Sequence, residues 1–373
     1  MKNSTLLALI PVAMMSSFAF ADLPESDDAT QAMIDQAAAP KFLLPQQNVS
    51  GGQTVSATAT KQGEKKPVSS ASSSYLPFWG DEARALGYEL PEPFGVSVSY
   101  MNIRQNINVD SIAFNGLGLG SGSNFIALPS NLFDIKVGKT RQKSETETMK
   151  LDAWVLPFMN VYGIIGHTKG SSISNVSVDS DPSNFKGLSN TLNRIISNVI
   201  HGMNQNGTLK DIDFKLDFKG TTYGAGTTLV GGYGDWFSMV DINYTQTRFD
   251  ILDGSIDAFT LSPRVGYRFS IPAIDALHMG PSKLNVWVGS MYQDVQQEFK
   301  GNLNDLNMPA ELQKLMAMAN EDGKGRFDVK QHLQSPWNVL LGAQYEVTRN
   351  FNLITEFGFA ERNSFFVSGE YRF

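Results

Sequence analysis

The sequence predicts an all-β protein, a transmembrane antiparallel up-and-down β-barrel of about 10 strands (10–12) with short helices in long extracellular loops. Three observations lead to this fold class. Apolar and polar residues alternate with period two from Phe94 onward, the connections between the alternating stretches are short and long in turn, and the last stretch ends at the aromatic Phe373. Lipid outside a barrel and a polar lumen inside it require this alternation.

The composition agrees with a β-rich chain, although it would also fit a soluble β-sandwich. The 33 glycines, 24 phenylalanines and 18% charged residues suit many turns and apolar outward positions. The chain has no cysteine, which excludes a disulfide framework and a lipidated cysteine. The net charge is −7 and no basic stripe is present, so nucleic acid is not expected as a partner.

The first residues predict a secretory signal peptide over 1–21. Lys2 supplies a positive start, Leu6 to Met15 form a short apolar run, and Ala19-Phe20-Ala21 is a small-x-small cleavage site. The mature chain is therefore expected to begin at Asp22.

Residues 22–93 are expected to form a flexible periplasmic segment, and 94–373 the barrel. Up to about Ser74 the chain is rich in Ala, Ser, Thr, Gln and Lys, and it has too little apolar surface to offset the entropy of ordering. The aromatic residues within 75–79 break this pattern, and a short helix is predicted near 81–86. This cluster is expected either to cap the barrel from the periplasm or to anchor the chain at the membrane interface.

The alternation defines the strands most clearly over 259–269, 327–347 and 211–219. In each of these stretches we expect the apolar face to contact lipid and the polar face to line the lumen. The template predicts about ten spans, and residues 110–140 leave room for two more. The spans are roughly 95–109, 142–156, 158–169, 211–232, 236–249, 257–270, 283–299, 326–347, 350–360 and 364–373.

The predicted connections fall into two groups by length. The connections at Pro157, 234–235 and 348–350 are tight turns, and 271–282 is a longer link on the same side. The long segments 110–141, 170–210 and 300–325 all fall on the other side. Short periplasmic turns and long extracellular loops are the pattern of outer-membrane barrels.

The last strand places Phe365, Val367, Gly369, Tyr371 and Phe373 on one face. This pattern resembles the C-terminal signature of Gram-negative outer-membrane β-barrel proteins. The resemblance implies location in the outer membrane, insertion by the barrel-assembly machinery, and contact with outer-membrane lipid and lipopolysaccharide. It covers only the last strand and implies no particular activity.

Acidic and basic residues are interleaved on the faces that the alternation assigns to the lumen. They are Arg104, Lys150, Asp152, Asp211, Asp213, Lys215, Asp217, Lys219, Asp241, Arg264, Arg268, Asp328, Lys330, Glu346, Glu356, Glu370 and Arg372. Isolated charges there would carry a desolvation cost of several kcal/mol each. We therefore favour a structural ion-pair network over a water-lined path for small solutes, since barrels near eight strands are filled by side chains.

Two amphipathic helices are predicted in the long loops. One carries Leu192, Ile195, Ile196, Val199, Ile200 and Met203, and the other carries Met308, Leu312, Leu315 and Met316. They are expected to pack on neighbouring loops or on the barrel rim; a constriction of the barrel mouth or an apolar binding site is the alternative.

The sequence predicts no catalytic residues, metal or cofactor. None of the four histidines, His167, His201, His278 and His332, lies in a recognisable catalytic pattern, although His332 is expected in the lumen network. Asp179, Asp181 and Ser183 resemble the start of a calcium loop, but Asn184 and Asn190 replace its required Gly and Glu.

Two function classes remain open for a monomeric barrel. One is a narrow channel or transport protein for small solutes, and the other is a closed structural or surface-interaction barrel that acts through its extracellular loops. An outer-membrane hydrolase comes third, and the protein is not expected to be an enzyme. About twelve strands or more would favour a pore, and about ten or fewer a closed barrel.

Overall fold

The structure, a computed structural model, describes residues 75–85, 90–272, 282–306, 309–348 and 350–373, without the side chains of 311, 312 and 315. The predicted signal peptide and most of the predicted flexible segment, up to residue 74, lie outside the described residues, as do Met308 and His278. Within the described ranges, no helix is long and apolar enough to span a membrane.

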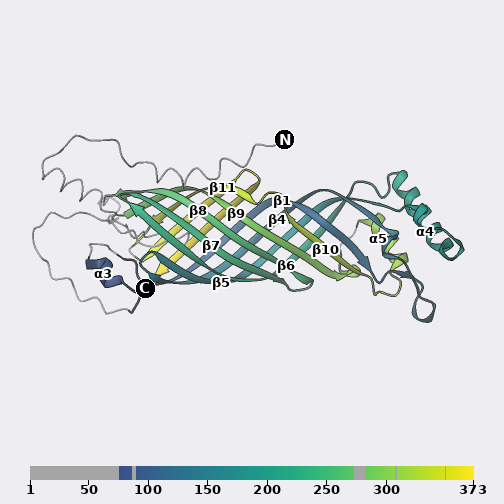
Figure 1. The fold of residues 1–373 in the computed structure, drawn as a ribbon, viewed down its shortest axis with the longest axis horizontal. Coiled ribbons are helices and arrows are strands. Elements are labelled where there is room, and N and C mark those ends of the chain that lie inside the picture. The colour runs from purple at the N-terminus through teal and green to yellow at the C-terminus, as the bar shows by residue number, and fades with distance from the viewer. Residues whose placement is uncertain (1–74, 86–89, 273–281, 307–308, 349) are drawn as a thin grey trace, which may run out of the picture. The chain divides into compact units, whose positions relative to one another are not determined.

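Eleven strands form one antiparallel sheet that closes into a ring, which confirms the predicted barrel. The ring closes at β1 (Phe94–Asn115), which pairs with β4 (Asp134–Leu156) on one side and β13 (Arg362–Arg372) on the other. Figure 1 shows the strong tilt of the strands that closure of a sheet requires. The other wall strands are β5 (Met159–Asp179), β6 (Ile212–Tyr233), β7 (Trp236–Phe249), β8 (Asp253–Ile271), β9 (Ser282–Asn302), β10 (Arg326–Leu333), β11 (Trp337–Glu346) and β12 (Phe351–Phe359).

The wall has fewer strands at one end than at the other. β10 and β11 follow one another along β9, where they pair with residues 296–302 and 284–292 respectively. β10 pairs directly with β1, at residues 107–115, because the β12–β13 hairpin reaches only as far as residue 105 of β1. One section of the wall therefore has ten strands and the section beyond the hairpin has eight.

The ten predicted spans correspond to the wall strands, except that the break at 334–336 divides the span over 326–347 into β10 and β11. The strands reach further into the long connections than predicted, since β1 continues to Asn115 and β5 to Asp179. Between β1 and β4 a separate ladder of two short strands, β2 (Gly118–Leu119) and β3 (Ile126–Ala127), lies outside the wall.

The barrel has a turn end and a loop end (Figure 1). The turn end carries the short connections after β4, β6 and β11, and α3 (Gly80–Ala85) lies there. The Phe78 N–H donates to the carbonyl oxygen of Val155 at 2.9 Å and joins the chain before α3 to this end. The loop end carries α4 (Thr191–Gln205) and α5 (Ala310–Ala319).

A belt of apolar side chains surrounds the ten-stranded section on its outer surface. Phe259 and Phe269 mark its two edges on β8 and are both exposed. Ten residues at ~3.3 Å each, tilted by ~40°, span about 25 Å, which matches the apolar band of outer-membrane barrels. Exposed aromatic residues border the belt at the turn end at Phe94, Tyr233, Trp236, Phe351, Tyr371 and Phe373, and at the loop end at Tyr223, Tyr244, Trp337, Phe359 and Phe365.

The belt leads to a prediction about Val288, which is 60% exposed on the outer face of β9. A Val288→Arg substitution would place a charge in lipid and should lower the free energy of unfolding by ~2–4 kcal/mol. Gln296→Arg, on the same face beyond the belt, should cost less than about 1 kcal/mol. Denaturant titrations of both variants in lipid vesicles measure the difference, and equal losses would contradict the placement of the belt.

The eight-stranded section is filled by an apolar cluster, named here the outer core. It joins residues from the wall, from the long loops and from both loop-end helices. Its buried members are Leu117, Leu132, Val176, Val178, Phe185, Ile200, Leu209, Leu216, Phe218, Phe299, Leu303, Met316, Ala319, Phe327 and Val329. Filling by side chains is expected at this strand number.

Candidate functional site

A chamber of about 270 Å³ lies inside the ten-stranded section. More than half of its lining residues are serine, threonine, asparagine or glutamine, and nine are apolar, among them Met101, Ile164 and Met291. Small side chains help to leave this space, because Ser or Thr occupies three of the five lining positions on β4 and two of the five on each of β1 and β8.

Four threonine hydroxyls form a hydrogen-bonded row around the chamber wall. Thr146 and Thr168 lie 3.0 Å apart, Thr168 and Thr222 2.6 Å, and Thr222 and Thr247 2.7 Å. Each hydroxyl can donate one hydrogen bond and accept two, so the row keeps capacity for water or for a polar solute. The row crosses β4, β5, β6 and β7 at one level.

At the loop end, a glutamine network closes the chamber. Gln105 and Gln297 both donate to Gln142 Oε1, at 3.0 and 2.9 Å, and Gln331 donates to Gln297 Oε1 at 2.8 Å. The small apolar cluster of Ile107, Val295 and Leu333 is buried on the same inner faces. The outer core follows beyond this layer.

At the turn end, a buried ion pair closes the chamber. Arg264 contacts Glu356 through two hydrogen bonds, Nε to Oε2 at 2.7 Å and Nη2 to Oε1 at 2.9 Å. Trp287 Nε1 donates to the same Oε2 at 2.8 Å. Paired, bidentate geometry is what allows two charges to remain in a low-dielectric interior.

A second charged group lies still closer to the turn end. Arg372 Nη1 contacts Asp152 Oδ1 at 2.8 Å and Glu370 Oε1 at 3.1 Å, and Lys150 Nζ lies 3.5 Å from Asp152. Asn160 donates to Asp152 at 2.7 Å. Two cations and two anions thus neutralise each other within one buried cluster.

Asp241 is satisfied without a cation in contact. Its carboxylate accepts hydrogen bonds from the Tyr162 hydroxyl at 2.8 Å, from Thr228 at 2.7 Å and from Asn243 at 2.7 Å. Three donors supply the hydrogen bonds that a buried carboxylate requires.

The structure divides the charged residues assigned to the lumen into two sets. The inner faces carry Lys150, Asp152, Asp241, Arg264, Arg268, Glu346, Glu356, Glu370 and Arg372. The placement of the other set is wrong, because these residues lie on the outer face, and His332 lies there with them. The outer-face set is Arg104, Asp211, Asp213, Lys215, Asp217, Lys219, Asp328 and Lys330.

The misplaced residues have a common physical cause. Beyond the belt the wall has water outside and the apolar outer core inside, so the apolar face there is the inner one. On β6, Leu216 and Phe218 face inward while Lys215 and Asp217 are exposed. On β10 and β11 the inner face also changes parity, from Leu333 to Asn338, across the break at 334–336.

The threonine row, the glutamine network and the donor Trp287 were not among the predicted site residues. These side chains carry no charge, and the predicted lumen residues were chosen by their charge. The signal that could have found them is the run of small polar residues at inward positions of β4 and β5, such as Thr146, Thr148 and Thr168.

The apolar stripe of the α4 helix is shared between two environments. Ile196, Ile200 and Met203 pack against the outer core, as expected for packing on the barrel rim. Ile195 and Val199 are exposed.

The acidic residues at the loop-end tip of β5 are held by hydrogen bonds. Burial raises the pKa of the Asp179 carboxyl, but hydrogen bonds from His201 and from the Ser180 N–H lower it by more. The pKa of Asp179 is therefore below its ordinary value. Hydrogen bonds from Ser183 hold the pKa of Asp181 below its ordinary value.

Four residues of the C-terminal signature lie on the outer face of β13, on the opposite side from Glu370 and Arg372, and the fifth, Phe373, follows the strand directly. Phe365, Tyr371 and Phe373 are among the exposed aromatic residues of the belt. Their role as an assembly signal stays a prediction.

No protein-family model and no curated protein matches the chain. Among solved structures, the transport unit of the autotransporter AIDA-I from Escherichia coli is similar at 8% identity and a TM-score of 0.31, over 75% of this chain and 90% of that one. The β domain of the Bordetella autotransporter BrkA is similar at 10% identity and a TM-score of 0.31, over 76% of this chain and 100% of that one. The outer membrane protein OprG from Pseudomonas aeruginosa is similar at 11% identity and a TM-score of 0.31, over 76% of this chain and 98% of that one.

Proposed function

We propose that this protein is an integral outer-membrane barrel that passes small polar solutes through its interior, with the chamber as one stage of the path. The observation that carries the proposal is the chamber itself, whose lining is rich in hydroxyl and amide groups and lies between the glutamine network and the Arg264–Glu356 pair. A barrel whose only role is structural would gain stability by filling this space, because voids in a packed interior cost free energy.

The turn-end layer is the natural gate in this proposal. Arg264 on β8 and Glu356 on β12 reach across the interior from strands that are not neighbours in the wall. A solute that passes here has to replace the hydrogen bonds between Arg264 and Glu356 with hydrogen bonds to itself. Its passage is therefore slow, and polar molecules are favoured.

Single-channel recording in a planar bilayer tests the proposal. The parent protein should give brief, salt-dependent steps, and the double variant Arg264→Ser, Glu356→Ser should give larger or more frequent ones because the gate is removed without leaving a lone charge. The control is Lys300→Ser, Glu298→Ser, which removes an ion pair of 2.7 Å from the outer face of β9 and should behave as the parent. Silence of parent and gate variant, with folding checked by heat-modifiable gel mobility, would contradict the channel.

The second candidate is a closed barrel that acts through its outer loops. Two observations favour it: the ten-stranded wall is near the size that side chains fill, and the outer core seals the loop end. The same recording decides between the candidates, since a closed barrel gives no current steps in the parent protein or in the Arg264→Ser, Glu356→Ser variant.

A further inference from the structure

Two pairs of like charges face each other directly on the outside of the wall. Arg104 on β1 is the cross-strand neighbour of Lys143 on β4, and Lys169 on β5 is the neighbour of Lys219 on β6. Like charges in this arrangement destabilise a sheet. Lys169 has a partner in Glu145 at 3.2 Å, but within the described part of the chain Arg104, Lys143 and Lys219 form no ion pair. The repulsion therefore calls for an external anion.

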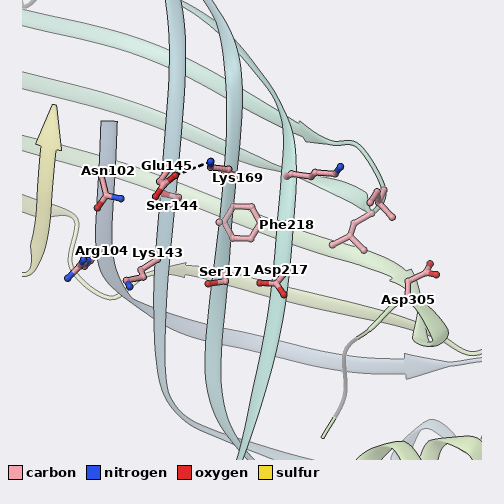
Figure 2. Close-up of a pocket in the computed structure, with 14 residues that line it drawn as sticks. Asn102, Arg104, Lys143, Ser144, Glu145, Lys169, Ser171, Asp217, Phe218 and Asp305 are labelled. Carbon is pink, nitrogen blue, oxygen red and sulfur yellow. Dashed lines mark ion pairs between the residues drawn. The ribbon is translucent and has the colours of Figure 1, made fainter. Parts of the chain in front are cut away.

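These cations line a groove of about 640 Å³ on the outer surface of β1, β4, β5 and β6. Figure 2 shows Arg104, Lys143, Ser171 and Asp217 following one another across the four strands. Of the acids that line the groove, Glu145 and Asp217 are already paired with lysines. The third acid is Asp305, so the groove lining carries four cations against three acids and keeps a net charge of +1.

The groove also has an apolar border. Ile251, in the connection between β7 and β8, lines it and is 69% exposed, and Leu252 lies beside it. Cations next to an exposed apolar side chain fit a molecule that carries both a negative charge and an apolar part.

The groove lies just beyond the belt. Lys169 is two outward positions past Ile165, and Lys219 is two past Tyr223, both of them exposed apolar residues of the belt. Four residues of a tilted strand correspond to about 10 Å above the belt edge. Lipid headgroups occupy this level of a bilayer.

We propose that this groove binds the phosphorylated headgroup of an anionic membrane lipid in the leaflet on the loop-end side. A phosphate between Arg104 and Lys143, or between Lys169 and Lys219, accepts charge-assisted hydrogen bonds from both members of a pair and removes their repulsion. The inference rests on the barrel's membrane placement and not on whether its interior conducts.

Native mass spectrometry and heat unfolding in detergent test the inference, with lipid A, a glycolipid with two phosphates, as the probe. The double variant Lys143→Gln, Lys219→Gln removes one cation from each pair and should bind lipid A about tenfold more weakly or worse. Without lipid it should unfold at the same temperature as the parent or higher, because repulsion is relieved. The control Lys136→Gln, Lys139→Gln removes two exposed lysines of β4 farther from the belt and should bind as the parent does.

Three results would overturn the inference. Equal retention of lipid A by parent and groove variant would show that the groove is not the site. A lower unfolding temperature of the lipid-free variant would show that the cations serve the fold. Full stabilisation by inorganic phosphate alone, with no further gain from lipid A, would assign the groove to a free anion.

Discussion

Replacing Glu356 with alanine should lower the free energy of unfolding by about 3–5 kcal/mol, because Arg264 would keep a buried charge with no partner for it. Both side chains are almost fully buried, with 2% of Arg264 and 6% of Glu356 exposed. The Trp287 N–H would lose its acceptor at the same time. Denaturant titration in lipid vesicles or detergent measures the loss.

The matched control replaces both partners by apolar side chains of similar size, Arg264→Met with Glu356→Leu. This double variant should recover most of the loss, since exchange of a whole buried pair for apolar residues is often neutral. The Trp287 N–H loses its acceptor in this variant too. A double variant as unstable as Glu356→Ala would mean that the pair itself is not the source of the effect.

Replacing Phe299 with alanine should cost about 3–5 kcal/mol, because its ring is fully buried in the outer core and leaves a cavity. It stacks on Phe249 with ring centroids 4.9 Å apart and packs against Phe218 at 5.5 Å. The loss of stability should be local. Amide hydrogen exchange should therefore rise at the loop ends of β6 and β9, while the ten-stranded section stays protected.

Phe259→Ala is the control for this prediction. Phe259 lies on the outer face of β8 and is 40% exposed, so its removal opens no cavity in the outer core. It should cost roughly half as much or less. Equal losses for the two variants, or exchange that rises uniformly along the strands, would contradict a separate core in the eight-stranded section.

The fold was predictable because the belt imposes a strict pattern. Over 259–269 a one-residue error would turn every apolar side chain from lipid to the interior, so the sequence of β8 allows one register. The loop-end sections were less predictable. There β6 keeps its alternation, but the apolar face packs on the outer core instead of lipid, and sequence alone does not show where the bilayer ends.

The candidate site was predictable in part for a similar reason. Arg264 and Glu356 lie on strands whose outward face is clearly apolar, so alternation alone places both inside. Their pairing is a long-range contact that alternation does not encode. The chamber depends on side chains being small at several strands at once, and that coincidence appears only when Thr146, Thr168 and Thr222 are aligned by the register.

The change from ten strands to eight has a consequence for the size of anything held inside. Barrel diameter grows roughly linearly with strand number, so the loss of two strands narrows the backbone by about a fifth. The chamber is lined by Ser364 and Phe366 of β13 and so lies on the wide side of this step. Substitutions in the outer core can clear side chains from the narrow section, but they cannot widen it. The main chain therefore sets an upper limit on the width of any opening at the loop end, whatever side chains fill it.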